Sequence, residues 1–106
     1  MMKIVASAIK VYPKGSEYPI IICGKRHCNC LETLWNSKIE VSKSKTIQGF
    51  YTDKDGFLDR YEAAILALEN GQMLAYSETL EKMRQDMLNN YGHLTKAYEL
   101  FSEDLW

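Results

Sequence analysis

The sequence predicts an α+β fold, with an N-terminal antiparallel β-sheet followed by C-terminal α-helices in a single compact domain. Residues 1–58 hold the β-branched runs, whereas apolar residues recur at helical spacing between residues 59 and 106. The chain of 106 residues is long enough for one hydrophobic core and too short for two domains. Its 46% hydrophobic and 25% charged residues are typical of a globular protein. We therefore expect a β-rich half, residues 1–58, and a helical half, residues 59–106.

A β-hairpin is expected at the start of the chain. Residues 3–12 are rich in Ile, Val and Ala, and residues 18–23 form a second β-branched run. Residues 13–16 between them have turn chemistry, because proline fixes one backbone angle and glycine accepts a positive one. Pro19 lies early in the second run, which suits an edge strand or a strand start.

A short helix and a third strand are expected next. Residues 27–36 carry Leu31, Leu34 and Trp35 at helical spacing. Residues 38–44 are polar and fit a loop or a weak strand.

Residues 47–52 are predicted to be the third strand, interrupted by Gly49. Residues 53–56 then form a tight turn that leads into Phe57 and Leu58.

The helical half begins with a capping box, in which Asp59 and Glu62 each accept a backbone donor at the helix start. This helix is predicted over residues 60–70 and ends at Gly71. Its apolar face is expected to consist of Ala64, Ile65 and Leu68.

A longer helix is expected to follow and to end at Gly92. Apolar side chains recur there at alternating three- and four-residue steps, at Met73, Tyr76, Leu80, Met83, Met87 and Tyr91. This narrow seam fits a core stripe or a groove for a partner helix. The tail, residues 100–106, ends on a large aromatic ring and is expected to be docked on its own domain or on a neighbour.

The charge distribution excludes some classes of partner. The net charge of −1 lacks the basic excess of proteins that bind long nucleic acid. Residues 1–60 nevertheless carry ten Lys and Arg against six Asp and Glu, and residues 61–106 carry three against eight. The split fits either two solvated faces or an anion-facing first half. No apolar run approaches 18 residues, so we expect no membrane span, and three cysteines without a secretion signal suit a reducing cytoplasm.

Metal binding is considered at two places. Residues 51–62 have the register of a calcium loop, but Tyr51 stands where the motif needs a carboxylate and a strand precedes it. Four potential zinc ligands lie within eight residues without the spacing of a zinc knuckle, namely Cys23, His27, Cys28 and Cys30. We expect no metal and no cofactor. A cysteine nucleophile near His27 would lack a third residue to orient the histidine, so we expect no enzyme.

An anion pocket is the remaining candidate. Residues 24–27 follow a strand and combine backbone amides with the Arg26 guanidinium, which suits a phosphate. Arg60 stands at the first position of a helix, whose amides attract negative charge. Phe50, Tyr51 and Phe57 flank the turn between these regions and could stack on a base, although core packing is the simpler reading of Phe50 and Phe57.

Several strings resemble a family of small phage and prophage proteins. They are QGFYT at residues 48–52, GFLDRYEAA at 56–64, NGQ at 70–72 and FSEDLW at 101–106, with KIVASAIK at 3–10 and GKRH at 24–27. The pattern is similar to the phage anti-Thoeris proteins of the first type, which act as nucleotide sponges. Residues 73–98 depart from it, because they look longer and more regularly helical.

This resemblance implies an N-terminal antiparallel sheet, C-terminal helices and assembly into dimers or larger oligomers with a shared site. It also implies sequestration, without hydrolysis, of a cyclic ADP-ribose isomer or a cyclic oligonucleotide in the host bacterial cytoplasm. The matching positions outside the tail are Arg26, His27, Gln48, Phe50, Phe57, Asp59 and Arg60.

From their chemistry we expect Arg26 and Arg60 to bind phosphate and Phe50 or Phe57 to stack. The alternative is a small interaction module that binds a protein partner through the helical seam; calcium or zinc binding is less favoured.

Overall fold

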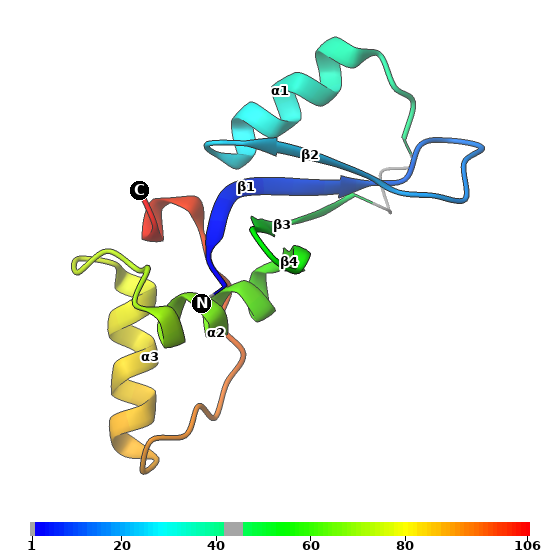
Figure 1. The fold of residues 1–106 in the computed structure, drawn as a ribbon. Helices are drawn as coiled ribbons and strands as arrows, with labels where there is room; N and C mark the ends of the chain where they lie inside the picture. The colour runs from blue at the N-terminus through cyan, green and yellow to red at the C-terminus, as the bar shows by residue number, and fades with distance from the viewer. Residues whose placement is uncertain (1, 42–45) are drawn as a thin grey trace.

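The computed structural model describes residues 2–41 and 46–106 and has the α+β architecture that the sequence predicts (Figure 1). All strand pairs are antiparallel, in the sheet order β2-β1-β3-β4. The elements are β1 (Ile4–Val11), β2 (Ile20–Gly24), α1 (His27–Ser37), β3 (Ile47–Thr52), β4 (Gly56–Asp59), α2 (Arg60–Asn70), α3 (Glu78–Asn89) and a short 3₁₀-helix, η2 (Ser102–Asp104).

The first hairpin is confirmed. β1 pairs with β2 from Ser7↔Gly24 to Val11↔Ile20, and β2 is an edge strand with Pro19 just before its start. In the turn, the Ser16 amide donates to the Pro13 carbonyl at 3.0 Å. Of the residues predicted as loop or weak strand, Val41 forms an isolated bridge with Pro13, whereas residues 42–44 lie outside the described residues.

The second hairpin leads directly into α2. β3 has the predicted bounds, and β4 is a strand where the sequence indicated only a lead-out from the turn. Asp59 ends β4 and also caps α2, since its Oδ1 accepts the Tyr61 and Glu62 amides at 3.0 and 2.8 Å. The Glu62 carboxylate accepts the Asp59 amide at 3.4 Å, so the predicted capping box is confirmed. α2 ends, as predicted, at Gly71, whose φ of +73° favours glycine.

Two groups of buried residues share one face of the sheet. Strand register places Ser7 and Phe50 opposite each other, and Ile9 points to the same face because side chains alternate along a strand. Ile9 packs with Val11 and the α1 residues Cys30 and Leu34, whereas Phe50 packs with the alanines of α2, with α3 and with the C-terminal tail. The molecule is elongated, about 47 × 24 × 23 Å.

The apolar face predicted for α2 is wrong by one position. Ile65 is 48% exposed, and the buried residues are Ala63, Ala64 and Ala67. Small side chains allow the helix to approach the sheet closely, so the alanines face the Phe50 ring and the larger Ile65 is excluded from the core.

The long second helix is also corrected. α3 begins at Glu78, because the Ser77 hydroxyl caps it by accepting the Leu80 amide at 3.0 Å. Met73 and Tyr76 precede the helix, and Tyr91 follows it with a φ of +54°. The predicted seam therefore continues beyond α3 at both of its ends. The buried residues of α3 are Leu80 and Met83.

The tail is docked on its own domain, as expected. Leu100 and Leu105 are buried, and the Trp106 indole Nε1 donates to the Lys25 carbonyl at 2.6 Å. In the part of the chain that the structure describes, no helix combines the length and apolar character needed to cross a membrane.

Candidate functional site

Two arginines flank the C-terminal segment, which we define as residues 99–106. Arg26 stands at the start of α1 and Arg60 at the start of α2, and each follows a strand of the sheet. Segments that are distant in the sequence are thereby joined: Arg26 contacts Trp106, 80 positions away, and the Arg60 carbonyl accepts the Leu100 amide, 40 positions away, at 3.1 Å.

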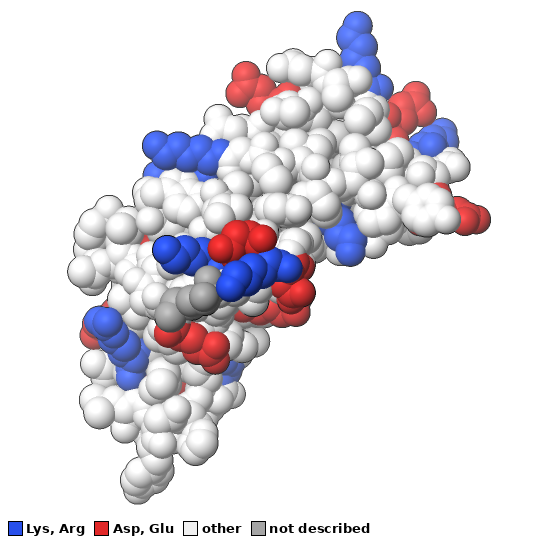
Figure 2. All heavy atoms as spheres, viewed as in Figure 1, with Lys and Arg blue, Asp and Glu red and all other residues white. Residues whose placement is uncertain are grey.

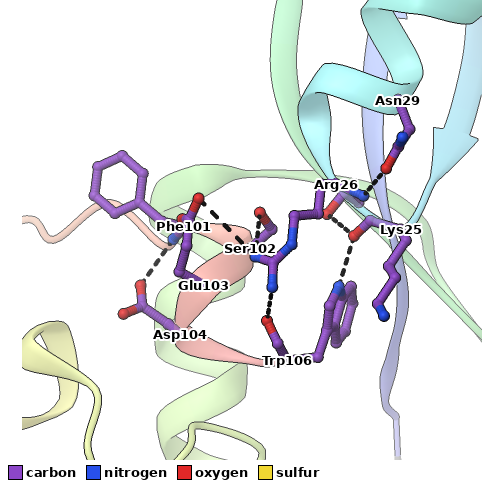
Figure 3. Close-up of polar contacts among 9 residues, drawn as sticks. Lys25, Arg26, Asn29, Phe101, Ser102, Glu103, Asp104 and Trp106 are labelled. Carbon is purple, nitrogen blue, oxygen red and sulfur yellow. Dashed lines mark hydrogen bonds and ion pairs between the residues drawn. The ribbon is translucent and has the colours of Figure 1, made fainter.

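Arg26 is used to hold this segment in place (Figure 3). Its Nη1 donates to the Ser102 hydroxyl at 3.4 Å and lies 3.9 Å from a Glu103 carboxylate oxygen, while Nη2 donates to the Trp106 carbonyl. The Arg26 amide donates to the Asn29 side chain, which caps α1. The Arg26 guanidinium therefore connects the start of α1 to the C-terminal segment.

Arg60 has a different environment. Its guanidinium carbon lies 4.9 Å from the centre of the Phe101 ring, an arrangement that favours a cation. Nη2 donates to Gln48 Oε1 at 2.5 Å, and Nη1 lies 4.0 Å from a Glu99 oxygen. The Nε–H is buried and has no hydrogen-bond partner among the described residues. An unpaired buried donor lowers the stability of the fold.

A hollow of about 470 Å³ opens beside Arg60. The Tyr61 hydroxyl donates to Glu99 at 2.8 Å across this site, and this hydrogen bond raises the pKa of Tyr61. Ring surface is available around the arginine, since Tyr61 is 46% and Phe101 is 40% exposed. The lining residues are Thr46, Ile47, Gln48, Asp59, Arg60, Tyr61 and Glu99. Three of the expected site residues, Gln48, Asp59 and Arg60, are thus brought together.

His27 and Phe50 are structural. His27 is buried, and its Nε2–H must donate to the Gly49 carbonyl at 2.7 Å, since a carbonyl can only accept. Burial lowers the pKa of His27, and the positive charge of Arg60 acts in the same direction, against the Gly49 hydrogen bond and the Glu103 charge. Phe50 meets the imidazole edge-on at 5.1 Å and has no exposed surface. It offers no ring face to a ligand, contrary to one of our expectations.

Phe57 lies on the opposite face of the sheet. The register pairs it with Tyr51, one position away from Phe50, so it points away from both arginines. Its ring packs over Gly49, and the Lys10 ammonium lies 5.9 Å from the ring centre. The expectation that Phe57 stacks on a ligand held by Arg26 or Arg60 does not fit this arrangement.

The two candidate metal sites have other roles. Residues 51–62 form a hairpin and a helix start, in which Asp53 accepts the Lys3 amide and Asp59 caps α2. Cys30 is buried while Cys23 and Cys28 are exposed, and burial raises the pKa of the Cys30 thiol to about 11, so it stays protonated. Within residues 2–41 and 46–106, no three His, Cys, Asp or Glu side chains could hold a metal ion together.

Sequence reasoning missed the aromatic and acidic neighbours of Arg60. Phe101 belongs to the FSEDLW string, but its ring could not be placed beside Arg60 without the fold. Tyr61 follows the predicted helix start directly, which was a usable signal for its position near Arg60. Glu99 had no signal, because it precedes the matched tail string.

Comparisons with known proteins give one match. Residues 3–106 match the family described as phage T4 y16D protein. No curated protein and no solved structure matches significantly. The expectation that the chain resembles a phage protein family is thus confirmed, while sequestration of a signal stays a prediction. The chain belongs to the phage T4 y16D protein family.

Proposed function

We propose that this protein binds a small anionic nucleotide, a cyclic immune signal such as a cyclic ADP-ribose isomer, beside Arg60 and sequesters it unchanged. The observation that carries the proposal is the Arg60 guanidinium, which stacks on Phe101, lies 4.0 Å from a Glu99 carboxylate oxygen and belongs to a residue that lines an open hollow. Arginine recognises phosphate through its fork of N–H donors, and the start of α2 adds a favourable helix dipole.

The hollow has the size and the surfaces for such a ligand. Its volume of about 470 Å³ lies within the range of small-molecule sites. The exposed ring of Tyr61, which lines the hollow, offers a stacking surface for a base, and such a contact contributes about 1–3 kcal/mol. The Gln48 side-chain amide adds a hydrogen-bonding group next to the arginine.

Glu99 is the internal competitor of an anionic ligand. Its carboxylate lies 4.0 Å from Arg60 Nη1, and 42% of its side chain is exposed. A partly exposed ion pair of this kind contributes about 0–1 kcal/mol, so a phosphate can replace it. The proposal therefore requires Glu99 to move aside when the ligand binds.

We propose binding without catalysis because neither acidic group of the hollow is placed as a free general base beside a bound phosphate. Asp59 accepts two amides at the start of α2, and Glu99, which accepts the Tyr61 hydroxyl in the free protein, moves away from Arg60 when the ligand binds. His27 is buried against Gly49 and its pKa is lowered, so it is not placed to shuttle protons into the hollow. A ligand held here keeps its phosphate bonds.

The test is a thermal-shift panel of cyclic ADP-ribose isomers and cyclic di- and trinucleotides, followed by titration calorimetry of any ligand found. A ligand at one hundred times its dissociation constant adds about 2.7 kcal/mol of stability. Arg60→Gln should abolish the shift, whereas Lys54→Gln, which removes the same charge from the exposed β3–β4 turn, should keep it. The ligand recovered after heat denaturation should be intact. No shift with any member of the panel, or an equal shift in Arg60→Gln, contradicts the proposal.

The second candidate is the interaction module that uses the helical seam. It is favoured by two seam residues on either side of α3, Tyr76 and Tyr91, which are 79% and 96% exposed. If this is the main role, these side chains bind a protein and the nucleotide panel leaves the melting temperature unchanged.

A further inference from the structure

Residues 93–98, which we call the strap, leave the end of α3 and return along it toward α2 (Figure 1). The strap contains no helix or strand. Before it, the Gly92 amide donates to the Met87 carbonyl of α3 at 2.8 Å, and after it the amide of the buried Leu100 donates to the Arg60 carbonyl. Among the described residues, no backbone–backbone hydrogen bond involves residues 94–99. The strap is therefore held between two fixed ends by side-chain contacts.

One carboxylate of α3, that of Asp86, binds the strap. Its Oδ2 accepts the Thr95 amide at 2.9 Å and the Tyr98 hydroxyl at 3.2 Å, and its Oδ1 accepts the Thr95 hydroxyl at 2.6 Å. The Asn90 side-chain amide donates to the same Oδ1 at 2.8 Å. The Thr95 hydroxyl and amide are the main reason why the pKa of Asp86 is lowered. A single charged side chain thus joins the strap to the helix at two of its residues.

The rest of the strap is only loosely packed. A hollow of about 400 Å³ lies between α3 and the strap, where Lys96 and Tyr98 line it. Leu94 and Tyr98 are half-buried against the hydrophobic core, whereas the other four strap residues are exposed. Segments with few buried apolar contacts and exposed backbone open locally at less cost than the whole fold.

The turn before the strap has the geometry of a hinge. Tyr91 and Gly92 have φ values of +54° and +87°, and a non-glycine residue is uncommon in this left-handed region. Tyr91 is 96% exposed, and Figure 2 shows only uncharged atoms at this tip of the molecule, where α3 ends. Rotation at these two exposed residues therefore disturbs no buried side chain.

The other end of the strap adjoins the Arg60 hollow. Tyr98 is bonded to Asp86, and the next residue, Glu99, lies with its carboxylate 4.0 Å from Arg60 Nη1. Leu100 is buried and anchored, so an open strap changes the path of the chain up to Glu99 and leaves the following residues in place. The position of Glu99 thus depends on the strap.

We propose that the strap opens as one unit, about Tyr91 and Gly92, when its hydrogen bonds to Asp86 break, and that this opening frees Glu99 to leave Arg60. The second part rests on the proposed function, in which an anionic ligand replaces Glu99. Opening of the strap is then the step that admits the ligand. Asp86 is a positioning residue, which sets how often this step occurs.

Native-state hydrogen exchange by NMR, without nucleotide, tests whether the strap opens as a unit. The Thr95 amide reports on the strap, and the Leu100 amide reports on the anchored residue after it. Tyr98→Phe removes one hydroxyl that does not touch Thr95, and it should speed Thr95 exchange about fivefold while Leu100 exchange stays unchanged. Tyr76→Phe, at an exposed ring before α3, should change neither amide. Thr95 exchange that is unaffected by Tyr98→Phe overturns the strap.

Limited trypsin digestion measures the same opening, because Lys96 lies inside the strap. Asp86→Asn keeps the size of the side chain but removes its charge, and it should speed cleavage after Lys96 about tenfold. Glu81→Gln is the matched control, since this carboxylate of α3 accepts the Gln85 side chain and, in the described structure, is not bonded to the strap. Circular dichroism shows whether each variant is folded. Equal cleavage rates in a folded Asp86→Asn and in wild type overturn the role of Asp86.

The link to the hollow is tested by stopped-flow mixing with each cyclic ADP-ribose isomer and cyclic oligonucleotide that wild type binds. Asp86→Asn should raise the association and dissociation rate constants together, about tenfold, and change the dissociation constant by less than about twofold. A merely structural role of Asp86 would weaken binding without faster association. Association no faster in Asp86→Asn overturns the entry route. If no nucleotide binds, the proposed function and the entry route both fail, whereas exchange and digestion still decide whether the strap opens.

Discussion

The starts of α1 and α2 form an instructive pair, because each helix follows a β-strand and each has an arginine at its beginning. Arg26 is held by Ser102, Glu103 and Trp106. Arg60 stacks on Phe101 and lines an open hollow, and its buried Nε–H has no partner in the part of the chain that the structure describes. The positions differ by one residue, because Arg26 is the N-cap of α1 whereas Arg60 is the first residue of α2. The two arginines contact different parts of the C-terminal segment, and only Arg60 is among the residues that line the hollow.

Gly49 supports both helix starts, and replacing it should have the largest effect. Its carbonyl accepts from His27 of α1, and its neighbour Gln48 accepts from Arg60 of α2. A Cβ at this position would lie 2.1 Å from the Leu58 carbonyl oxygen and 2.6 Å from the Phe57 ring. Gly49→Ala should therefore lower the free energy of unfolding by about 3 kcal/mol. Urea denaturation measures it. Gly15→Ala in the first hairpin is the comparison without a steric clash: a Cβ there would meet no atom within 4 Å, and only the φ of +80° should cost about 1 kcal/mol. A loss at Gly49 no larger than at Gly15 would contradict this packing.

Variants of the two arginines should differ in their effect on the stability of the fold. Arg26→Ala breaks charged hydrogen bonds that hold the tail and should cost about 1.5 kcal/mol. It should also speed proteolysis within residues 99–106, which mass spectrometry of a time course detects. Arg60→Ala should cost less stability, because Arg60 makes fewer hydrogen bonds and its guanidinium already leaves one donor unpaired. Equal losses in the two variants, or faster proteolysis in Arg60→Ala, would remove the distinction between the two helix starts.

Lowering the pH should reduce the free energy of unfolding through His27, at the start of α1. Burial lowers the pKa of His27 below its ordinary 6.5, so the unfolded chain takes up its proton first. The contribution of neutral His27 is complete above pH 6.5 and is lost as the pH falls toward the folded pKa. His27→Gln should therefore flatten the stability profile below pH 6.5, measured by urea denaturation at several pH values. His93→Gln, which alters an exposed histidine, should leave the profile unchanged. An unaltered slope in His27→Gln would show that another group causes the acid sensitivity.

Glu99→Gln should have the smallest effect of these variants, and it tests whether the ligand binds at Arg60. The exchange removes the charge that competes with an anionic ligand, and an exposed pair contributes about 0.2–1 kcal/mol. Ligand affinity should rise about two- to fivefold in calorimetry, with little change in melting temperature of the free protein. Glu103→Gln relieves Arg26 in the same way and should leave affinity unchanged. A weaker complex in Glu99→Gln would mean that Glu99 itself contacts the ligand.

Local signals made the fold predictable. α2 has its predicted bounds because Asp59, Glu62 and Gly71 are cap residues whose effect is confined to one turn. The predicted second helix is longer than α3 because helical spacing of apolar residues already begins at Met73 and Tyr76. The cap residue Ser77 marks the true start of the helix. A four-residue strand such as β4 is too short for periodicity to reveal.

The candidate site was less predictable because it depends on contacts distant in sequence. Phe50 and Phe57 are near in sequence, but strand register places them on opposite faces of the sheet, and register was not readable from either segment alone. Both arginines contact the C-terminal segment, which is distant in sequence. Glu99 lies 39 positions after Arg60, and Trp106 lies 80 positions after Arg26. Arg60 and Gln48 were predictable because one hairpin carries both.

The most direct test of the Arg60 assignment is calorimetric titration of wild type, Arg60→Gln and Arg26→Gln with cyclic ADP-ribose isomers and cyclic oligonucleotides, at a temperature where all three are folded. We expect stoichiometric binding of one such ligand by wild type and by Arg26→Gln, and loss of binding in Arg60→Gln. Binding retained in Arg60→Gln but lost in Arg26→Gln, or no binding by wild type to any of these ligands, would contradict it.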